Sequence, residues 1–207
     1  MFLKICFVKK FLNIKTISVV KPIIFVCVFI FFSCINEQKD YNIMFIGDSL
    51  IARWDVESSF PSVLSENLGR SGSGIAYIEE LNDKFNGCDI VVLFGTNDLG
   101  MAKRIGIEAY AERYVNAIIN LKGRNIYLYS ILPRSFKGDQ IGLNDLIDSL
   151  NQNIKKRIII YKNVKYINVN SQFRTQHGMN EELSYDGLHL NNYGYEILSR
   201  ELKKYIE

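Results

Sequence analysis

Short apolar segments alternate with longer amphipathic segments along the chain from residue 42 onward. Apolar-rich segments of four to seven residues are typical of strands that are buried on both faces of a parallel sheet. Such segments predict strands at residues 43–46, 89–94, 126–132 and 164–169, and a weaker pattern predicts a strand at residues 64–68.

Apolar residues that recur every three or four positions predict the helices between these strands. Residues 107–121 and 143–158 carry clear faces of this kind, and a last helix is expected near residues 192–206. Shorter helices are expected near residues 57–66 and 75–85. Gly123 is expected to end the helix over residues 107–121, since glycine is common just past a helix end.

Strands that alternate with helices predict a parallel sheet with helices on both faces. We therefore expect the α/β class, with a single three-layer αβα sandwich built on a five-stranded parallel sheet. A chain of 207 residues is long enough for one domain with a real core, and too short for two of ordinary size. The pattern contains no internal repeat or linker, so the domain is expected to occupy residues 42–207.

The first 33 residues have a different pattern. Residues 23–32 form an unbroken run of ten apolar residues, whereas about twenty are needed to span a bilayer. The run predicts the core of an export signal, with a short membrane anchor as the alternative. Phe31-Phe32-Ser33-Cys34 resembles a bacterial lipobox, although Phe31 stands where leucine is usual. The resemblance implies a signal peptide over residues 1–33, lipidation of Cys34, a tether over residues 34–41, and a membrane-anchored location in the cell envelope.

Charge and cysteine content limit the classes of partner and fold. The leader of 33 residues holds five lysines and no acidic residue, so the formal charge of +3 becomes −2 for the rest of the chain. No basic field remains to favour nucleic acid as a partner. Cys88 is the one cysteine of the predicted domain, so an internal disulfide is not expected.

Several chemistries lack their sequence signatures. The glycines at residues 69–74 are spaced as GxxGxG, so the dinucleotide fingerprint is absent, and so is GxxxxGK[ST]. Two histidines and one domain cysteine form no cluster with zinc-ligand spacing. The GxSxG elbow is also absent, because Leu50 and Ile51 follow Ser49. We therefore expect neither a metal nor another cofactor.

Ser49 is the candidate nucleophile, because it follows the predicted strand at residues 43–46 after a turn-forming Gly-Asp pair. Open α/β sheets place their chemistry at the carboxyl ends of strands. A serine needs a base, and His189 lies three residues after Asp186 in a glycine-containing turn. This spacing lets the carboxylate reach one ring nitrogen and leaves the other for the serine, as in a Ser-His-Asp triad. Turn and helix-cap roles are the alternative for Asp186 and His189, and His177 is expected at the surface.

Acyl transfer also needs hydrogen-bond donors for the developing oxyanion. Asn97 lies just past the predicted strand at residues 89–94, which places it at the same edge of the sheet. The backbone amide of Gly72 is a second candidate donor, with Gly74 as a near alternative, and the amide of Ser49 is a third.

Four segments resemble, in order and spacing, the blocks of the SGNH (GDSL-type) hydrolases. They are Gly47-Asp48-Ser49-Leu50, Gly72, Gly95-Thr96-Asn97-Asp98 and Asp186-Gly187-Leu188-His189. A lone GDSL is weak evidence, but four blocks in order are specific. The resemblance implies a flavodoxin-like sandwich with Ser49 as nucleophile, His189 as base and Asp186 as its orienting acid. It also implies an oxyanion hole made by Ser49, Gly72 and Asn97.

The segment around the first block resembles the acetylhydrolase branch of this family most closely. That resemblance implies an esterase that removes small acyl groups. An open site suits such an ester of a polar or glycan alcohol, and with the export signal this predicts an envelope esterase that deacetylates carbohydrate. Trp54, Arg53 and Arg134 are expected near an open site, with core packing of Trp54 and a solvated charge at Arg53 as alternatives. A lysophospholipase or thioesterase is a second hypothesis, and a catalytically silent glycan-binding lipoprotein of the envelope is a third.

Overall fold

The structure is a computed structural model that describes residues 42–82, 84, 85 and 87–207. The predicted signal peptide over residues 1–33, the lipidation of Cys34 and the tether over residues 34–41 all lie outside these residues. Within the described part of the chain, every helix is too short or too polar to cross a bilayer.

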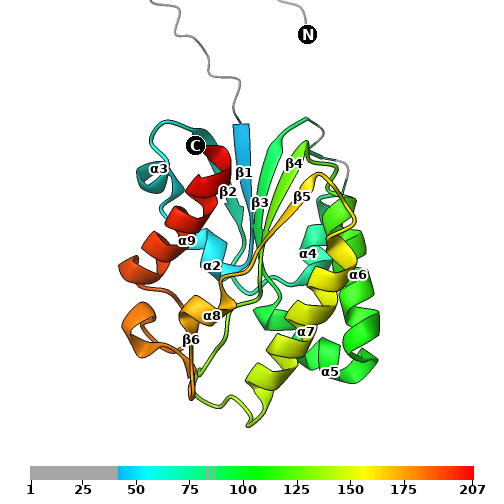
Figure 1. The fold of residues 1–207 in the computed structure, drawn as a ribbon, viewed down its shortest axis with the longest axis vertical. Coiled ribbons are helices and arrows are strands. Elements are labelled where there is room, and N and C mark those ends of the chain that lie inside the picture. Colours follow the sequence, from blue (N-terminus) through cyan, green and yellow to red (C-terminus); the bar gives the residue numbers. More distant parts are fainter. Residues whose placement is uncertain (1–41, 83, 86) are drawn as a thin grey trace, which may run out of the picture. The chain divides into compact units, whose positions relative to one another are not determined.

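A sheet of five parallel strands forms the middle layer, as predicted, in the order β2-β1-β3-β4-β5 (Figure 1). The strands are β1 (Asn42–Gly47), β2 (Leu64–Gly69), β3 (Asp89–Leu93), β4 (Asn125–Tyr129) and β5 (Val164–Ile167). The chain steps from β1 to β2 in one direction and then to β3 on the other side of β1. The carboxyl ends of β1 and β3 therefore flank a topological switch point, where sheets of this kind bind ligands.

Helices cover both faces of the sheet (Figure 1). One face carries α2 (Ser49–Ala52), α3 (Val56–Ser59), α8 (Asn170–Phe173) and α9 (Asn192–Ile206). The other carries α4 (Ile75–Glu80), α5 (Leu99–Ile105), α6 (Ile107–Ile119) and α7 (Leu143–Ile158). Two hydrophobic clusters result, one on each face of the sheet. Alternate residues of β1 supply them, with Phe45 in the first cluster and Ile46 in the second.

The helix predicted near residues 57–66 is wrong over most of its length. Helix α3 ends at Ser59, because Phe60 leaves helical geometry and Pro61 follows it. Residues from Leu64 onward belong instead to β2, the edge strand, which pairs in parallel with β1. The predicted strand at residues 64–68 is therefore confirmed.

Two helix ends also differ from the prediction. Helix α4 ends at Glu80, although Leu81 and Phe85 still reach the core beyond it. Helix α6 ends at Ile119, and the residue with left-handed backbone is Lys122, with φ of 54°, instead of Gly123. A β-carbon at Gly123 would collide with the Ile90 side chain, so this glycine is needed for packing against β3.

Several short elements were not predicted from the sequence. They are α5, α8, the two-stranded hairpin of β6 (Arg174–Thr175) and β7 (Gly178–Met179), and the 3₁₀ turns η1 (Thr96–Asp98) and η2 (Glu181–Leu183). Most lie beyond the carboxyl ends of the strands, where they build the rim of the candidate site.

Candidate active site

Ser49 is the first residue of α2, directly beyond β1. The Asp48 side chain caps this helix, because its Oδ1 accepts the Leu50 amide at 2.9 Å. A β-carbon at Gly47 would collide with the Leu93 carbonyl of β3, so only glycine lets the two strands end this close together. The turn leaves Ser49 7 % exposed at the switch point.

A continuous chain of hydrogen bonds joins the three residues that the sequence singled out. The Ser49 Oγ lies 3.1 Å from His189 Nε2, and His189 Nδ1 lies 2.7 Å from Asp186 Oδ2. The other oxygen of Asp186 accepts the His189 amide at 2.7 Å, so this carboxylate fixes both the ring and the backbone of the histidine. The structure therefore brings Ser49, His189 and Asp186 together in the arrangement of a Ser-His-Asp triad.

The turn that holds Asp186 and His189 is organised by Ser184, whose role was not predicted. Its hydroxyl donates to the His189 carbonyl at 3.0 Å and accepts the Gly187 amide at 2.8 Å. Gly187 has a φ of 80°, and a β-carbon there would collide with Ser135. A serine two residues before an aspartate is a common hydroxyl-stabilised turn, and that was the signal available in the sequence.

Two opposing effects act on Asp186. Partial burial raises the pKa of its carboxyl group, but hydrogen bonds from the His189 ring, the His189 amide and the Leu188 amide outweigh it. The net pKa lies below the usual value, so the carboxylate stays ionised and continues to accept from the ring.

Asn97 lies at the same edge of the sheet, in η1 directly beyond β3. Its side chain is exposed, and its Nδ2 donates to the Ser73 carbonyl at 2.8 Å. The Ser73 hydroxyl in turn donates to the Gly47 carbonyl at 3.2 Å, which connects this region to the end of β1. An amide nitrogen has two hydrogens, so Asn97 can hold this contact and still donate to an oxyanion.

Gly72 and Gly74 lie in the glycine-rich turn beside Asn97, and they differ in what requires a glycine. Gly72 is exposed with a φ of 75°, and its surroundings are open. Gly74 precedes α4, and a β-carbon there would collide with the Asp98 carboxylate. Packing against Asp98 therefore explains why residue 74 is a glycine. Gly72, in contrast, leaves its backbone open to the space beside the site.

Two carboxyl groups lie buried behind the nucleophile. Burial raises the pKa of Asp48 to about 7, the Leu50 amide opposes this rise, and the charge of Asp98 adds to it. Asp98 accepts from the Ile75 amide at 2.8 Å and from the Tyr110 hydroxyl at 3.0 Å on the same oxygen. Burial also raises the pKa of Asp98, against both hydrogen bonds.

The remaining residues expected near the site divide into three groups. Arg134 lies at the rim, where its guanidinium donates to the Thr96 carbonyl at 3.2 Å. Trp54 is 3 % exposed and packs edge-on against Phe45, so it is mainly a core residue. Arg53 is exposed, and His177 is exposed as predicted. Among the described residues, no group of three or more His, Cys, Asp or Glu side chains is arranged to hold a metal ion.

Comparisons with known proteins identify relatives in sequence and in fold. The N-acylneuraminate cytidylyltransferase of Escherichia coli O18:K1:H7 is 28 % identical over 187 residues, which are 84 % of this chain and 43 % of that protein. This chain thus spans less than half the length of that relative. A Streptococcus pneumoniae structure provisionally described as a platelet activating factor has a TM-score of 0.66 at 24 % identity, over 92 % of this chain and 100 % of that chain. An acetylxylan esterase from Geobacillus stearothermophilus has a TM-score of 0.58 at 16 % identity, over 80 % and 93 % of the two chains.

The family comparison covers the site itself. The profile of the GDSL-like lipase/acylhydrolase family matches residues 45–197, a range that includes Ser49, Asn97, Asp186 and His189. With this match over more than half of its length, the chain belongs to the GDSL-like lipase/acylhydrolase family.

Proposed function

We propose that this protein is a serine esterase that removes small acyl groups, acetyl above all, from carbohydrate. Its family supports the hydrolysis of acyl esters. The observation that carries the mechanism is the hydrogen-bond chain from Asp186 through His189 to Ser49, with distances of 2.7 and 3.1 Å. Such a chain is what a serine needs to become a nucleophile near neutral pH.

In this mechanism the Ser49 Oγ attacks the ester carbonyl carbon while His189 Nε2 takes its proton. Asp186 keeps a hydrogen on Nδ1 and stabilises the imidazolium that forms. The oxyanion of the tetrahedral intermediate accepts from the Ser49 amide, the Gly72 amide and Asn97 Nδ2. His189 then protonates the leaving alcohol, and it activates a water molecule that hydrolyses the acyl-enzyme.

Two comparisons support a carbohydrate alcohol. The Geobacillus stearothermophilus structure is an acetylxylan esterase, and the E. coli relative is named for N-acylneuraminate, a sugar acid. The acylated sugar of this protein is proposed to lie in the envelope, because the leader resembles that of a lipoprotein with Cys34 as the lipidated residue. Metabolic labelling with palmitate tests the anchor: label on the wild-type chain and none on Cys34→Ser supports it, whereas equal label on both excludes Cys34.

Hydrolysis of p-nitrophenyl acetate by the purified protein tests the function. Wild-type protein should release p-nitrophenol, and Ser49→Ala should lose that activity while it unfolds at the same temperature. Equal activity of the two proteins would exclude Ser49 as the nucleophile. A series of esters from acetate to octanoate tests the acyl group, and faster hydrolysis of octanoate would favour a lysophospholipase or thioesterase.

A further inference from the structure

A groove of about 680 Å³ lies beside the candidate triad, between the α2–α3 segment and helix α9. Arg53 and Trp54 line one side of it, Tyr185 and Leu190 line the end near the His-Asp turn, and α9 lines the other side. None of the catalytic steps proposed above uses this groove, so its lining residues need a separate explanation.

Backbone contacts place the near end of the groove close to the reacting groups. The Arg53 amide donates to the Ser49 carbonyl at 3.2 Å, which puts Arg53 one helical turn from the nucleophile. The Tyr185 amide donates to the His189 carbonyl at 2.9 Å. Ser49, Asp186 and His189 do not line the groove themselves, but two of its lining residues are thus bonded to the backbones of Ser49 and His189.

The floor of the groove is fixed by buried or half-buried side chains. The Tyr195 hydroxyl donates to the Leu50 carbonyl at 2.8 Å, and Trp54 Nε1 donates to the Ser59 hydroxyl at 3.0 Å. Tyr185, in contrast, is 73 % exposed at the edge of the groove. A rigid floor with an exposed aromatic ring suits the flat apolar face of a sugar.

Of the three basic residues that line the groove, Arg53 is the one without an ion pair among the described residues. In the part of the chain that the structure describes, no carboxylate lies within ion-pair distance of its guanidinium, whereas Arg200 and Lys203 have Glu201 and Glu207 as neighbours at 3.8 and 3.9 Å. Arg53 and Tyr195 both line the groove, and the charge of Arg53 opposes the rise that burial causes in the pKa of Tyr195.

Two acidic residues also line the groove, and neither neutralises Arg53 in this structure. Asp55 caps α3, where it accepts the Ser58 amide at 3.1 Å. Glu196 is exposed on α9 and makes no ion pair with Arg53. Glu196 would repel an anion in the same groove. Replacing Glu196 should therefore strengthen the binding of an anion there, whereas replacing Arg53 should weaken it.

We propose that this groove binds the alcohol part of the ester and that Arg53 binds its carboxylate, so that the preferred substrate is the acetyl ester of an acidic sugar. The proposal rests on the proposed esterase function and adds the class of sugar to it. Arginine suits the role because its planar fork matches a carboxylate with two parallel hydrogen bonds. A phosphate would offer similar chemistry, and the experiment separates the two sources.

The test compares three acetyl esters: 9-O-acetyl-N-acetylneuraminate, its carboxyl methyl ester, and 1-acetylglycerol 3-phosphate. The methyl ester keeps the sugar and removes the charge. Wild-type protein should prefer the free acid over the methyl ester in kcat/KM by roughly ten- to hundredfold, mainly through KM, as expected for a hydrogen bond to a charged group. Arg53→Gln should bring this ratio close to one, and Glu196→Gln should increase it.

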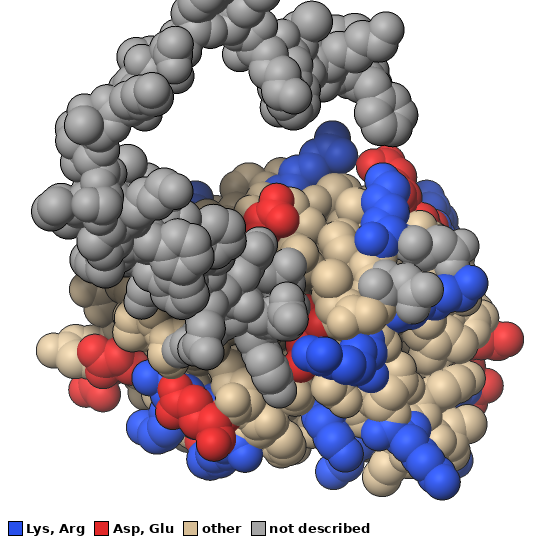
Figure 2. All heavy atoms as spheres, turned by 90° about the horizontal axis from the view of Figure 1, so that it is seen from above, with Lys and Arg blue, Asp and Glu red and all other residues tan. Residues whose placement is uncertain are grey.

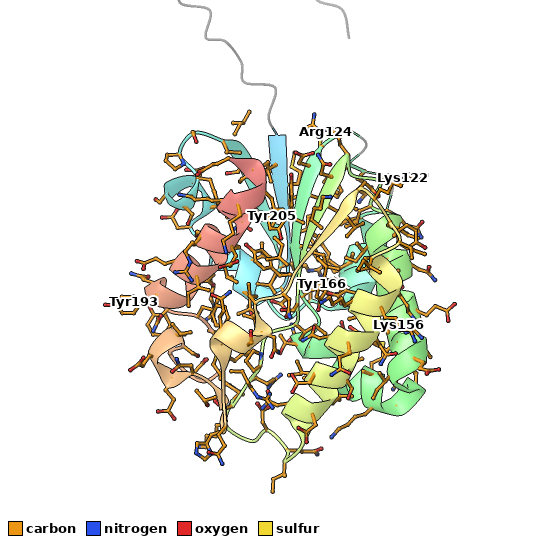
Figure 3. All side chains as sticks on the ribbon, in the orientation of Figure 1. Lys122, Arg124, Lys156, Tyr166, Tyr193 and Tyr205 are labelled. Atoms are coloured by element: carbon orange, nitrogen blue, oxygen red, sulfur yellow. The ribbon has the colours of Figure 1, made fainter. Side chains whose placement is uncertain are left out.

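Lys156→Gln is the matched control, because it also removes one positive charge. Lys156 lies on α7, on the opposite side of the sheet from α9, and is labelled in Figure 3. It should leave the ratio unchanged.

A wild-type ratio near one, or a ratio that Arg53→Gln does not change, would overturn the subsite even if p-nitrophenyl acetate is hydrolysed. A preference for the phosphate ester over the free sugar acid would overturn the acidic sugar, and no turnover of p-nitrophenyl acetate would contradict the esterase itself.

Discussion

Asp48 stands directly before the candidate nucleophile and is fully buried. Its Oδ1 accepts the Leu50 amide, but its Oδ2 has no hydrogen-bond partner among the described residues. A charged carboxylate in such a place is unfavourable, which is why burial raises the pKa of Asp48 to about 7. A neutral carboxylic acid can cap α2 with the same oxygen and avoid that penalty.

The raised pKa predicts that stability falls with rising pH. Between pH 3.8 and about 7, unfolded Asp48 has lost its proton while folded Asp48 still holds it, so folding takes up a proton. The free energy of unfolding should therefore fall by as much as about 1.4 kcal/mol per pH unit in this window and level off above it. Asp48→Asn mimics the protonated acid, so it should remove this part of the slope.

Urea unfolding of both proteins at pH 5 and pH 8 measures the effect. Wild-type protein should lose more free energy of unfolding between these two pH values than Asp48→Asn does. An identical difference for the two proteins would mean that Asp48 titrates near its ordinary pKa in the folded state.

Asn97 offers a second test at the level of one side chain. If its Nδ2 donates to the oxyanion, Asn97→Ala should lower kcat for p-nitrophenyl acetate by roughly 10²–10³-fold, with a smaller change in KM. Among the described residues, its side chain makes one hydrogen bond, at 2.8 Å to the Ser73 carbonyl, and the residue is exposed, so the fold should tolerate the change. A kcat within threefold of wild type would remove Asn97 from the oxyanion hole.

The loop that follows β4 connects two parts of the site that are far apart in sequence. The Arg134 guanidinium pairs with Asp139 through contacts of 2.8 and 2.7 Å, and it donates to the Thr96 carbonyl beside Asn97. The Ser135 amide donates to the Gly187 carbonyl at 2.8 Å. One loop thus holds both the segment of Asn97, the proposed oxyanion donor, and the turn of His189, the proposed catalytic base.

We predict that Arg134→Gln lowers kcat about tenfold or more and changes KM less, because the side chain positions reacting groups without itself touching the acyl group. Arg134→Lys should have a kcat close to that of Arg134→Gln, since lysine cannot reproduce the two-pronged contact with Asp139. The steady-state constants of both variants provide the measurement.

Arg174→Gln is the control for this loop. It removes an arginine of the neighbouring hairpin that pairs with Asp148 at 3.4 Å and, within the described part of the chain, forms no hydrogen bond or ion pair with η1. Its kcat should stay near that of wild type. An equal fall in kcat for Arg134→Gln and Arg174→Gln would indicate a general loss of structure in place of a positioning effect.

What could be predicted from the sequence depended on whether the signal was local. The strand that ends at Gly47 and the turn at Ser49 follow from adjacent residues, and the structure has both. The segment LSENLG of β2 does not have the pattern of a buried strand, because edge strands are half-exposed, and so a helix was wrongly extended into it. Arg134 acts through contacts that depend on the folded chain, and no spacing in the sequence encodes them.

At the scale of the whole molecule, the parallel sheet is what gathers the site. Residues after β1, after β2, after β3 and before α9 all reach its carboxyl edge, because every strand runs in the same direction.

Figure 2 shows the opposite end, where the strands begin. On its visible described part, lysines and arginines are scattered among acidic side chains, so this part of the surface has no single-sign patch for a polyanion.

The position of β1 makes a sharp prediction about where the functional unit begins. Lys39–Glu207 forms one compact unit, and β1 is paired with both β2 and β3 inside it. A chain shortened to residues 39–207 should therefore unfold in one cooperative transition and keep the kcat/KM of the full chain for p-nitrophenyl acetate. A chain that starts at Asp48 retains every proposed catalytic residue but lacks β1. It loses the pairing of β1 with β2 and β3 and part of both hydrophobic clusters. This chain should therefore be unfolded and inactive. Comparable activity of the two shortened chains would mean that β1 does not hold Ser49 in place.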